Sequence, residues 1–136
     1  MTNAAVRSDA EAISAVAHQE MPERSIDLVF LAKQSLGDRD LEIELLSLFE
    51  KQAETIAARL VKPVCSNDRK WQHDLAHTLK GSARAVGAVR VAACAEEFEA
   101  ALAACVSDAQ LAEYAGRLDK EVAAARNVIQ GLIEAG

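Results

Sequence analysis

The sequence predicts an all-α domain, in which an antiparallel up-down four-helix bundle is preceded by an additional N-terminal helical segment. Strong helix formers recur along the 136 residues, apolar residues make up 51% of the chain, and aromatic residues only 4%. The chain holds two prolines and six glycines, and it lacks the β-branched runs that are typical of strands. This length can bury the core of one domain. Short loops between long helices favour antiparallel neighbours.

The N-terminal part of the chain differs from the rest. Residues 1–24 are rich in alanine, weakly patterned and interrupted at Met21-Pro22. We therefore expect a flexible or partly helical tail, with a short helix over residues 10–18. From Ser25 the apolar pattern becomes regular, and residues 25–136 are expected to form the bundle.

Two helices are predicted before a loop over residues 62–68. Asp27 can cap the first, short helix, which is expected to end near Gly37. Asp38 begins the longer second helix, which Pro63 stops. The apolar stripe of this helix, at the 3.6-residue period, consists of Leu41, Leu45, Leu48, Phe49, Ile56 and Leu60.

Three further helices are predicted after the loop. Asp68 can cap the third helix, and Gly87 closes it, because glycine tolerates the left-handed turn that often ends a helix. The fourth helix covers residues 89–105, and a turn at Ser107-Asp108 leads into the fifth. The core positions expected in these last two helices are Ala92, Ala95, Phe98, Leu102, Leu111, Leu118, Val122, Val128 and Leu132.

Charge and cysteine usage exclude several classes of function. The net charge is −6, and no basic stripe of the kind that neutralises nucleic-acid phosphates is visible, so we expect no nucleic-acid partner. No stretch approaches the ~18 apolar residues of a membrane span, and the N-terminus has no apolar signal region. We therefore expect no membrane partner and a cytoplasmic location. Cys65, Cys94 and Cys105 lack the spacing of a disulfide framework or zinc knuckle, and free thiols are expected.

The third helix is predicted to present an unusual polar face. With residues placed ~100° apart around the axis, the pole opposite His77 is occupied by Leu75, Leu79 and Val86. His77 should therefore point outward. The face within ~60° of it consists of Lys70, His73, Asp74, Lys80, Gly81, Arg84 and Ala88. Lys80 can reach any group attached to the imidazole, and Gly81 leaves space beside it for the backbone of another protein.

This pattern favours phosphoryl transfer. A neutral imidazole is a good nucleophile near pH 7, and an exposed one can be approached in line by the acyl phosphate of a partner. Transfer requires positioning and neutralisation of the phosphoryl oxygens more than covalent work by the protein. Lys80 is the natural charge for this purpose. A carboxylate that accepts a hydrogen bond from one ring nitrogen would fix the tautomer and leave the other nitrogen free to attack.

The residues around His77 also match a known signature. The run from His77 to Ala83, which reads HTLKGSA, and the following Gly87-Ala88 together resemble the HxxKGSxxxxGA signature of histidine-containing phosphotransfer (HPt) domains of bacterial multistep phosphorelays. Residues 26–53 resemble the leading segment of that family, and Phe98-Glu99 resembles its Leu-Glu on the next helix. The resemblance extends from about Ser25 to Leu132.

The resemblance implies a four-helix bundle in which His77 carries the phosphoryl group on Nε2, while Lys80 stabilises the phosphate. Gly81 would clear space for a response-regulator receiver domain. The polar residue that the family often places against Nδ1 corresponds to Glu99, with Glu96 one turn earlier. The implied partners are receiver domains and a hybrid sensor histidine kinase. No ATP-binding motif is visible, so we expect a phosphocarrier without its own ATP-dependent kinase activity and without a cofactor, with Mg²⁺ supplied by the receiver.

A receiver is expected to dock across the exposed face of the third helix. The residues predicted to contact it are Gly81, Arg84, Ala88, His73, Asp74 and Ala76. Among them, Ala76, Ala88 and Gly81 are expected to provide a small-residue apolar footing. Arg84 could contact the phosphate or an acidic receiver surface, or it could simply be solvated.

The residues are also compatible with two other functions. A non-catalytic helical adaptor would use the same face only to dock a receiver or another partner, without phosphate transfer. A metal-dependent hydrolase is suggested because the run from His73 to His77 resembles HExxH with Asp in place of Glu. Zinc hydrolysis needs a third protein ligand. The only other histidine, His18, lies in the tail, and we therefore expect no metal site.

Overall fold

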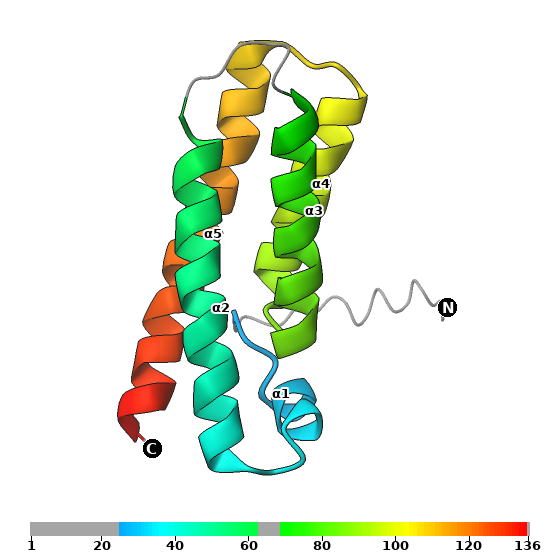
Figure 1. Cartoon of the computed structure of the whole chain (residues 1–136). Helices are drawn as coiled ribbons and strands as arrows, with labels where there is room; N and C mark the ends of the chain where they lie inside the picture. The colour runs from blue at the N-terminus through cyan, green and yellow to red at the C-terminus, as the bar shows by residue number, and fades with distance from the viewer. Residues whose placement is uncertain (1–24, 63–68, 136) are drawn as a thin grey trace, which may run out of the picture.

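The computed structural model describes residues 25–62 and 69–135, and every regular element in these ranges is a helix. The elements are α1 (Leu28–Gln34), α2 (Arg39–Leu60), α3 (Arg69–Val86), α4 (Val89–Ala103) and α5 (Asp108–Ala135). Helices α2 to α5 alternate in direction and form a four-helix bundle, and the short α1 lies at one end of it (Figure 1). This confirms the predicted all-α, up-down bundle with its additional N-terminal helical segment. The helix expected over residues 10–18 lies outside the described residues.

The helix boundaries follow from local capping. The side chain of Asp27 accepts a hydrogen bond from the backbone N–H three residues later at 3.1 Å, and Asp38 does the same at 3.2 Å. Gly87 ends α3 with a φ of +80°, in the left-handed region that favours glycine. These three predicted boundaries are confirmed. Those predicted at Pro63 and Asp68 fall in the part of the chain that is not described.

The core is formed by one stripe of each long helix. Helix α3 packs against α2 and α4, and α5 packs against the same two helices. The fully buried apolar side chains of greatest volume are Phe98, Ile26, Leu31, Leu46, Leu79, Leu118, Ile129 and Val91. All four core positions predicted in α4 are buried. Although α5 has 28 residues, no helix in the described ranges combines the length and the apolar character needed to cross a membrane.

One predicted core position in α2 is wrong. Leu48 is 61% exposed, whereas Leu46, which was not predicted, is fully buried. The buried residues of α2 after Leu46 are Phe49, Glu50, Ala53, Ile56, Ala57 and Leu60. Leu48 lies ~200° around the axis from Leu46 and therefore faces away from the core. The leucines of α2 are compatible with two stripes, and only packing against α3 and α5 decides between them.

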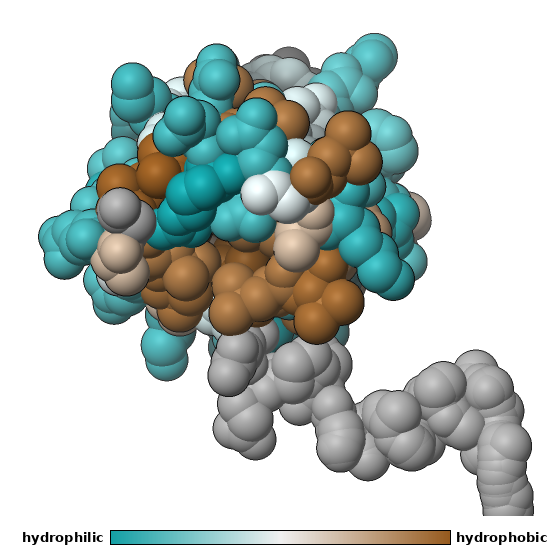
Figure 2. Space-filling model, turned by 90° about the horizontal axis from the view of Figure 1, so that it is seen from below, coloured by the Kyte–Doolittle hydropathy of each residue, from teal (hydrophilic) through white to brown (hydrophobic). Residues whose placement is uncertain are grey.

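Helix α1 is attached to the turn between α3 and α4. The backbone N–H of Asp27 donates to the carbonyl of Gly87 at 2.7 Å. A Cβ added at Gly87 would lie 2.9 Å from the carbonyl oxygen of Asp27. Glycine is therefore required for two reasons, the left-handed turn and the close approach of the two backbones. At this end of the bundle apolar side chains gather at the surface (Figure 2). The exposed large apolar residues of α1 and the turn after it are Leu28, Val29, Phe30 and Leu36.

Candidate functional site

His77 projects from the middle of α3 into solvent. Its side chain is 67% exposed, which agrees with the outward orientation predicted from the sequence. The reason is the register of the helix, whose buried residues are Gln72, Ala76, Leu79, Ala83 and Val86. These positions follow the alternating three- and four-residue spacing of a single stripe, and His77 lies on the other side of the axis.

Glu99 of α4 connects three nitrogen-bearing side chains of α3. Its Oε2 lies 2.9 Å from Nδ1 of His77, and its Oε1 lies 2.7 Å from Nζ of Lys80. Nε2 of His73 lies 3.6 Å from Oε2. The side chain of Glu99 is only 10% exposed, so its charge needs partners, and α3 supplies one on each of three successive turns. The position against Nδ1 is the one that the resemblance implied for Glu99.

The charge state of Glu99 determines the tautomer of His77. Burial alone would raise the pKa of Glu99, but hydrogen bonds from Lys80 and His77 and the charges of both side chains outweigh this effect, so the pKa lies below its usual value. An ionised carboxylate can only accept hydrogen bonds. Nδ1 must therefore carry the proton in the 2.9 Å contact. In the neutral ring the lone pair is then on Nε2, which can act as a nucleophile.

The rings of His73 and His77 are stacked one turn apart. Their centroids are 6.3 Å apart and their planes differ by 9°. His73 is 50% exposed, and its contact with Glu99 is longer than a hydrogen bond. It becomes an ion pair only when the imidazole of His73 is protonated.

Gly81 is not required by the fold. A Cβ added there would meet no atom within 4 Å, and the residue is exposed in the middle of α3. Glycine at a helical position costs ~1 kcal/mol relative to alanine. The open space beside His77 is consistent with the clearance for a partner that the sequence suggested.

Two of the residues predicted to contact a partner are not accessible. Ala76 and Ala88 are both fully buried, so the expectation that they provide an exposed apolar footing is wrong. Ala76 lies ~100° around α3 from His77 and belongs to the core stripe. Ala88 lies beyond the end of α3, where the chain has turned at Gly87, and its N–H donates to the carbonyl of Ala83 at 2.8 Å. Helical periodicity therefore does not place it.

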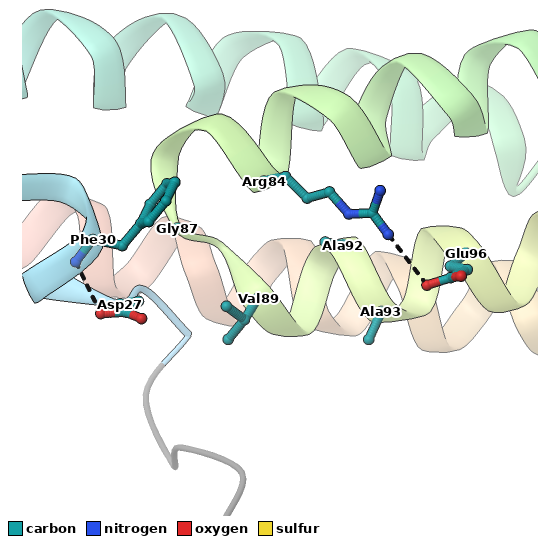
Figure 3. A pocket seen from close by; sticks show the side chains of 8 residues that line it. All are labelled: Asp27, Phe30, Arg84, Gly87, Val89, Ala92, Ala93 and Glu96. Carbon is teal, nitrogen blue, oxygen red and sulfur yellow. Dashed lines mark hydrogen bonds and ion pairs between the residues drawn. The ribbon is translucent and has the colours of Figure 1, made fainter. Parts of the chain in front are cut away.

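The remaining predicted residues lie on the exposed face in ion pairs. Asp74 lies 3.3 Å from Lys70, one turn earlier on α3. Arg84 reaches across to α4, where its guanidinium lies 3.4 Å from Glu96 (Figure 3). Both pairs are largely exposed, so each contributes little to stability. Their importance is that they set the pattern of charge around His77.

An open hollow of about 410 Å³ lies on the same side of the molecule, between α1, the end of α3 and the start of α4 (Figure 3). It is lined by Asp27, Phe30, Arg84, Gly87, Val89, Ala92, Ala93 and Glu96. The sequence did not reveal this feature, because its residues come from three elements. The signals that could have indicated it were the motif residue Gly87 and the site candidates Arg84 and Glu96.

The structure does not support the hypothesis of a metal-dependent hydrolase. Within residues 25–62 and 69–135, no group of three or more His, Cys, Asp or Glu side chains could hold a metal ion. His73 and His77 both direct a nitrogen at the same carboxylate. Cys94 and Cys105 are free thiols, and Cys65 lies outside the described residues.

Comparison with known protein families identifies the family to which this chain belongs. Residues 44–130 match the model of the Hpt domain. No curated protein and no solved structure matches the chain significantly. Hpt domains are histidine phosphocarriers without kinase activity, and they interact with receiver domains in phosphorelays. Because the match covers more than half of the chain, this protein belongs to the Hpt domain family and is a phosphocarrier of phosphorelay signal transduction.

Proposed function

We propose that His77 is the phosphorylated histidine of this Hpt domain and that it exchanges a phosphoryl group with aspartates of receiver domains. The observation that supports this most is the 2.9 Å contact between Nδ1 of His77 and Glu99. It fixes the proton on Nδ1 and leaves Nε2 of an exposed ring as the nucleophile.

The transfer needs no proton acceptor. The lone pair of Nε2 attacks the phosphorus of the aspartyl phosphate of the receiver. The bond from phosphorus to the carboxyl oxygen breaks, and its electron pair returns the aspartate to a carboxylate. Nδ1 keeps its proton, so the ring of His77 becomes a phosphorylated cation. Glu99 is already ionised and in place, and it stabilises the positive charge that develops on the ring. The reverse reaction follows the same path.

Lys80 would neutralise the phosphoryl oxygens. It lies three residues after His77, on the same side of α3, which is within reach of a group on the imidazole. In the unphosphorylated protein its Nζ is held by Glu99 at 2.7 Å. We propose that Lys80 moves from Glu99 toward the phosphoryl oxygens when the phosphoryl group arrives.

The hollow beside the site is the proposed footing for the receiver. A specific interface buries about 800 Å² on each partner, which extends well beyond one helix. Arg84 lies two turns after His77 on α3, and Glu96 lies one turn before Glu99 on α4, so the hollow that they border follows the site along the same two helices. We propose that an apolar side chain of the receiver fills the hollow and contacts Phe30 and the exposed Ala93 of α4.

The other partners follow from this reaction. A hybrid sensor histidine kinase would supply the phosphoryl group through its receiver, and Mg²⁺ would be bound by the receivers. The protein would act in the cytoplasm.

The test is transfer from phosphorylated receivers of the same organism. Wild-type protein should become labelled, and His77→Gln should lose the label while still binding the receiver. The label on wild type should be stable to alkali and labile to acid, as expected for a phosphorylated imidazole. A wild-type protein that binds a phosphorylated receiver but takes no label would contradict the proposal and favour the non-catalytic adaptor.

A second substitution tests the docking surface. Ala93 is exposed and lines the hollow, and Ala93→Glu should lower the transfer rate roughly tenfold at low receiver concentration, because a charge replaces an apolar contact. Ala124→Glu is the matched control, since Ala124 is exposed on α5, the helix that packs against α2 and α4. Equal rates for the two variants would show that the receiver docks elsewhere.

A further inference from the structure

We infer that His73 is a positioning residue, which takes the place of Lys80 on Glu99 when Lys80 moves to the phosphoryl group on His77. The inference rests on the proposed function, and it assigns to His73 a role that differs from direct contact with a receiver. The juxtaposition that carries it is the convergence of His73, His77 and Lys80 on one buried carboxylate.

The contacts of Glu99 show which partner can be replaced. Among the described residues, Lys80 is the one that binds Oε1, at 2.7 Å, whereas Oε2 faces both imidazoles, at 2.9 Å from His77 and 3.6 Å from His73. His77 has to keep its contact because the phosphorylated ring is cationic. Lys80 is therefore the partner that the carboxylate loses. His73, which lies farther from the carboxylate, is the residue that can replace it.

Phosphorylation creates the need for the exchange. A phosphoryl group adds roughly two negative charges, which attract the ammonium of Lys80. A carboxylate that is only 10% exposed is destabilised when it loses a cation. Protonation of His73 restores the lost charge, and a movement of a few tenths of an ångström would bring its Nε2 into hydrogen-bond range of Oε2.

The other charged groups near His73 are already paired. On α3, Lys70 pairs with Asp74 at 3.3 Å. On α4, Glu96 pairs with Arg84 at 3.4 Å, about three turns along α3 from His73. Helix α2 packs on the opposite side of α3, where Arg59 lies over the ring of Trp71. Among the described residues that contact Glu99, His73 is the one that remains after His77 and Lys80.

The consequence is a coupling between two equilibria. If phosphorylation of His77 favours protonation of His73, then protonation of His73 must favour phosphorylation by the same factor. An imidazole changes its charge between about pH 5 and 8. Transfer from the receiver to His77 should therefore become more favourable as the pH falls through this range.

The first experiment follows the ring of His73 by NMR titration in the unphosphorylated protein. Lys80→Gln removes the cation on Oε1, and the titration midpoint of His73 should rise by about one pH unit, because Glu99 then has only the histidines as partners. Lys70→Gln is the matched control, since it removes a lysine that lies one turn before His73 on α3 and pairs with Asp74 instead of Glu99. A shift in Lys70→Gln as large as that in Lys80→Gln would overturn the inference.

The second experiment separates this inference from the proposed function. The transfer equilibrium between a receiver and His77 is measured at pH 6 and pH 8 in the wild type and in His73→Gln. The wild type should gain up to about tenfold in phosphorylated His77 relative to the variant as the pH falls, which corresponds to a one-unit shift of the midpoint. Equal pH dependence in both proteins would overturn the role of His73 alone. No label on His77 in either protein would overturn the proposed function as well.

Discussion

At Gly81 the stability of the fold and the proposed reaction have opposite requirements. The residue is helical, exposed and surrounded by open space, so alanine could replace it without a clash. Alanine would also favour the helix. The glycine is therefore best explained by the approach of another molecule to His77, and this explanation can be tested separately from folding.

Gly81→Ala should raise the free energy of unfolding by roughly 0.5–1 kcal/mol and slow phosphoryl transfer, because the added methyl group lies where the receiver approaches. Urea denaturation and initial transfer rates measure the two effects. Gly116→Ala on α5 is the control, because an added Cβ there also meets nothing within 4 Å. It should raise the free energy of unfolding by a similar amount and leave the transfer rate unchanged. A Gly81→Ala protein that transfers at the wild-type rate would contradict this role.

Individual site residues were partly predictable from the sequence. Helical periodicity is enough to place His77, Lys80 and Gly81 on one exposed side of α3, and the resemblance to a family suggested Glu99. The sequence did not predict that Lys80 and His73 both face the same carboxylate. Which partners a buried carboxylate takes depends on how α4 packs against α3, and this is a tertiary property.

At the scale of elements, the sequence predicted helices better than the contacts between them. The caps at Asp27 and Asp38 are local, since each bonds the backbone within the next turn. The hydrogen bond from Asp27 to Gly87 joins positions far apart in the chain, and no local signal indicates it. The failures at Leu48 and Ala88 have the same origin, because neighbouring elements decided which face was buried.

The attachment of α1 can be tested at Gly87. Gly87→Ala should lower the free energy of unfolding by about 1–3 kcal/mol, because the residue has a φ of +80° and its Cβ would lie 2.9 Å from the carbonyl oxygen of Asp27. Gly131→Ala is the control, since an added Cβ meets nothing there. Chemical denaturation of both variants gives the comparison. Equal stability of the two would show that the close approach is not maintained in solution.

At the scale of the whole molecule, the group around Glu99 links α4 to α3 and makes stability depend on pH. The pKa of Glu99 is lower in the folded protein than its usual value of about 4.5. Its contribution to stability is therefore complete above that value and is lost as the pH falls through the lower, folded value. The bundle should be stabilised by this carboxylate at neutral pH and lose that stabilisation in acid.

The wild type should thus lose more stability between pH 5 and pH 3 than Glu99→Gln does, because the amide of the variant does not titrate. Denaturation by urea at each pH, followed by circular dichroism, measures the difference. Glu113→Gln, at an exposed position on α5, should show the acid sensitivity of the wild type. Parallel curves for the wild type and Glu99→Gln would contradict the stabilising role of the ionised carboxylate.

The backbone bond between Asp27 and Gly87 also decides where the chain enters the bundle. Since Asp27 itself lines the hollow, a segment fused directly before Ser25 would begin at the rim of the proposed receiver surface. A short tether gives an effective concentration in the millimolar range, so a purification tag fused directly before Ser25 would obstruct the surface on which the receiver is proposed to dock. A tag that follows α5 leaves from a helix that contributes nothing to the lining of the hollow, and it is the better choice for binding assays.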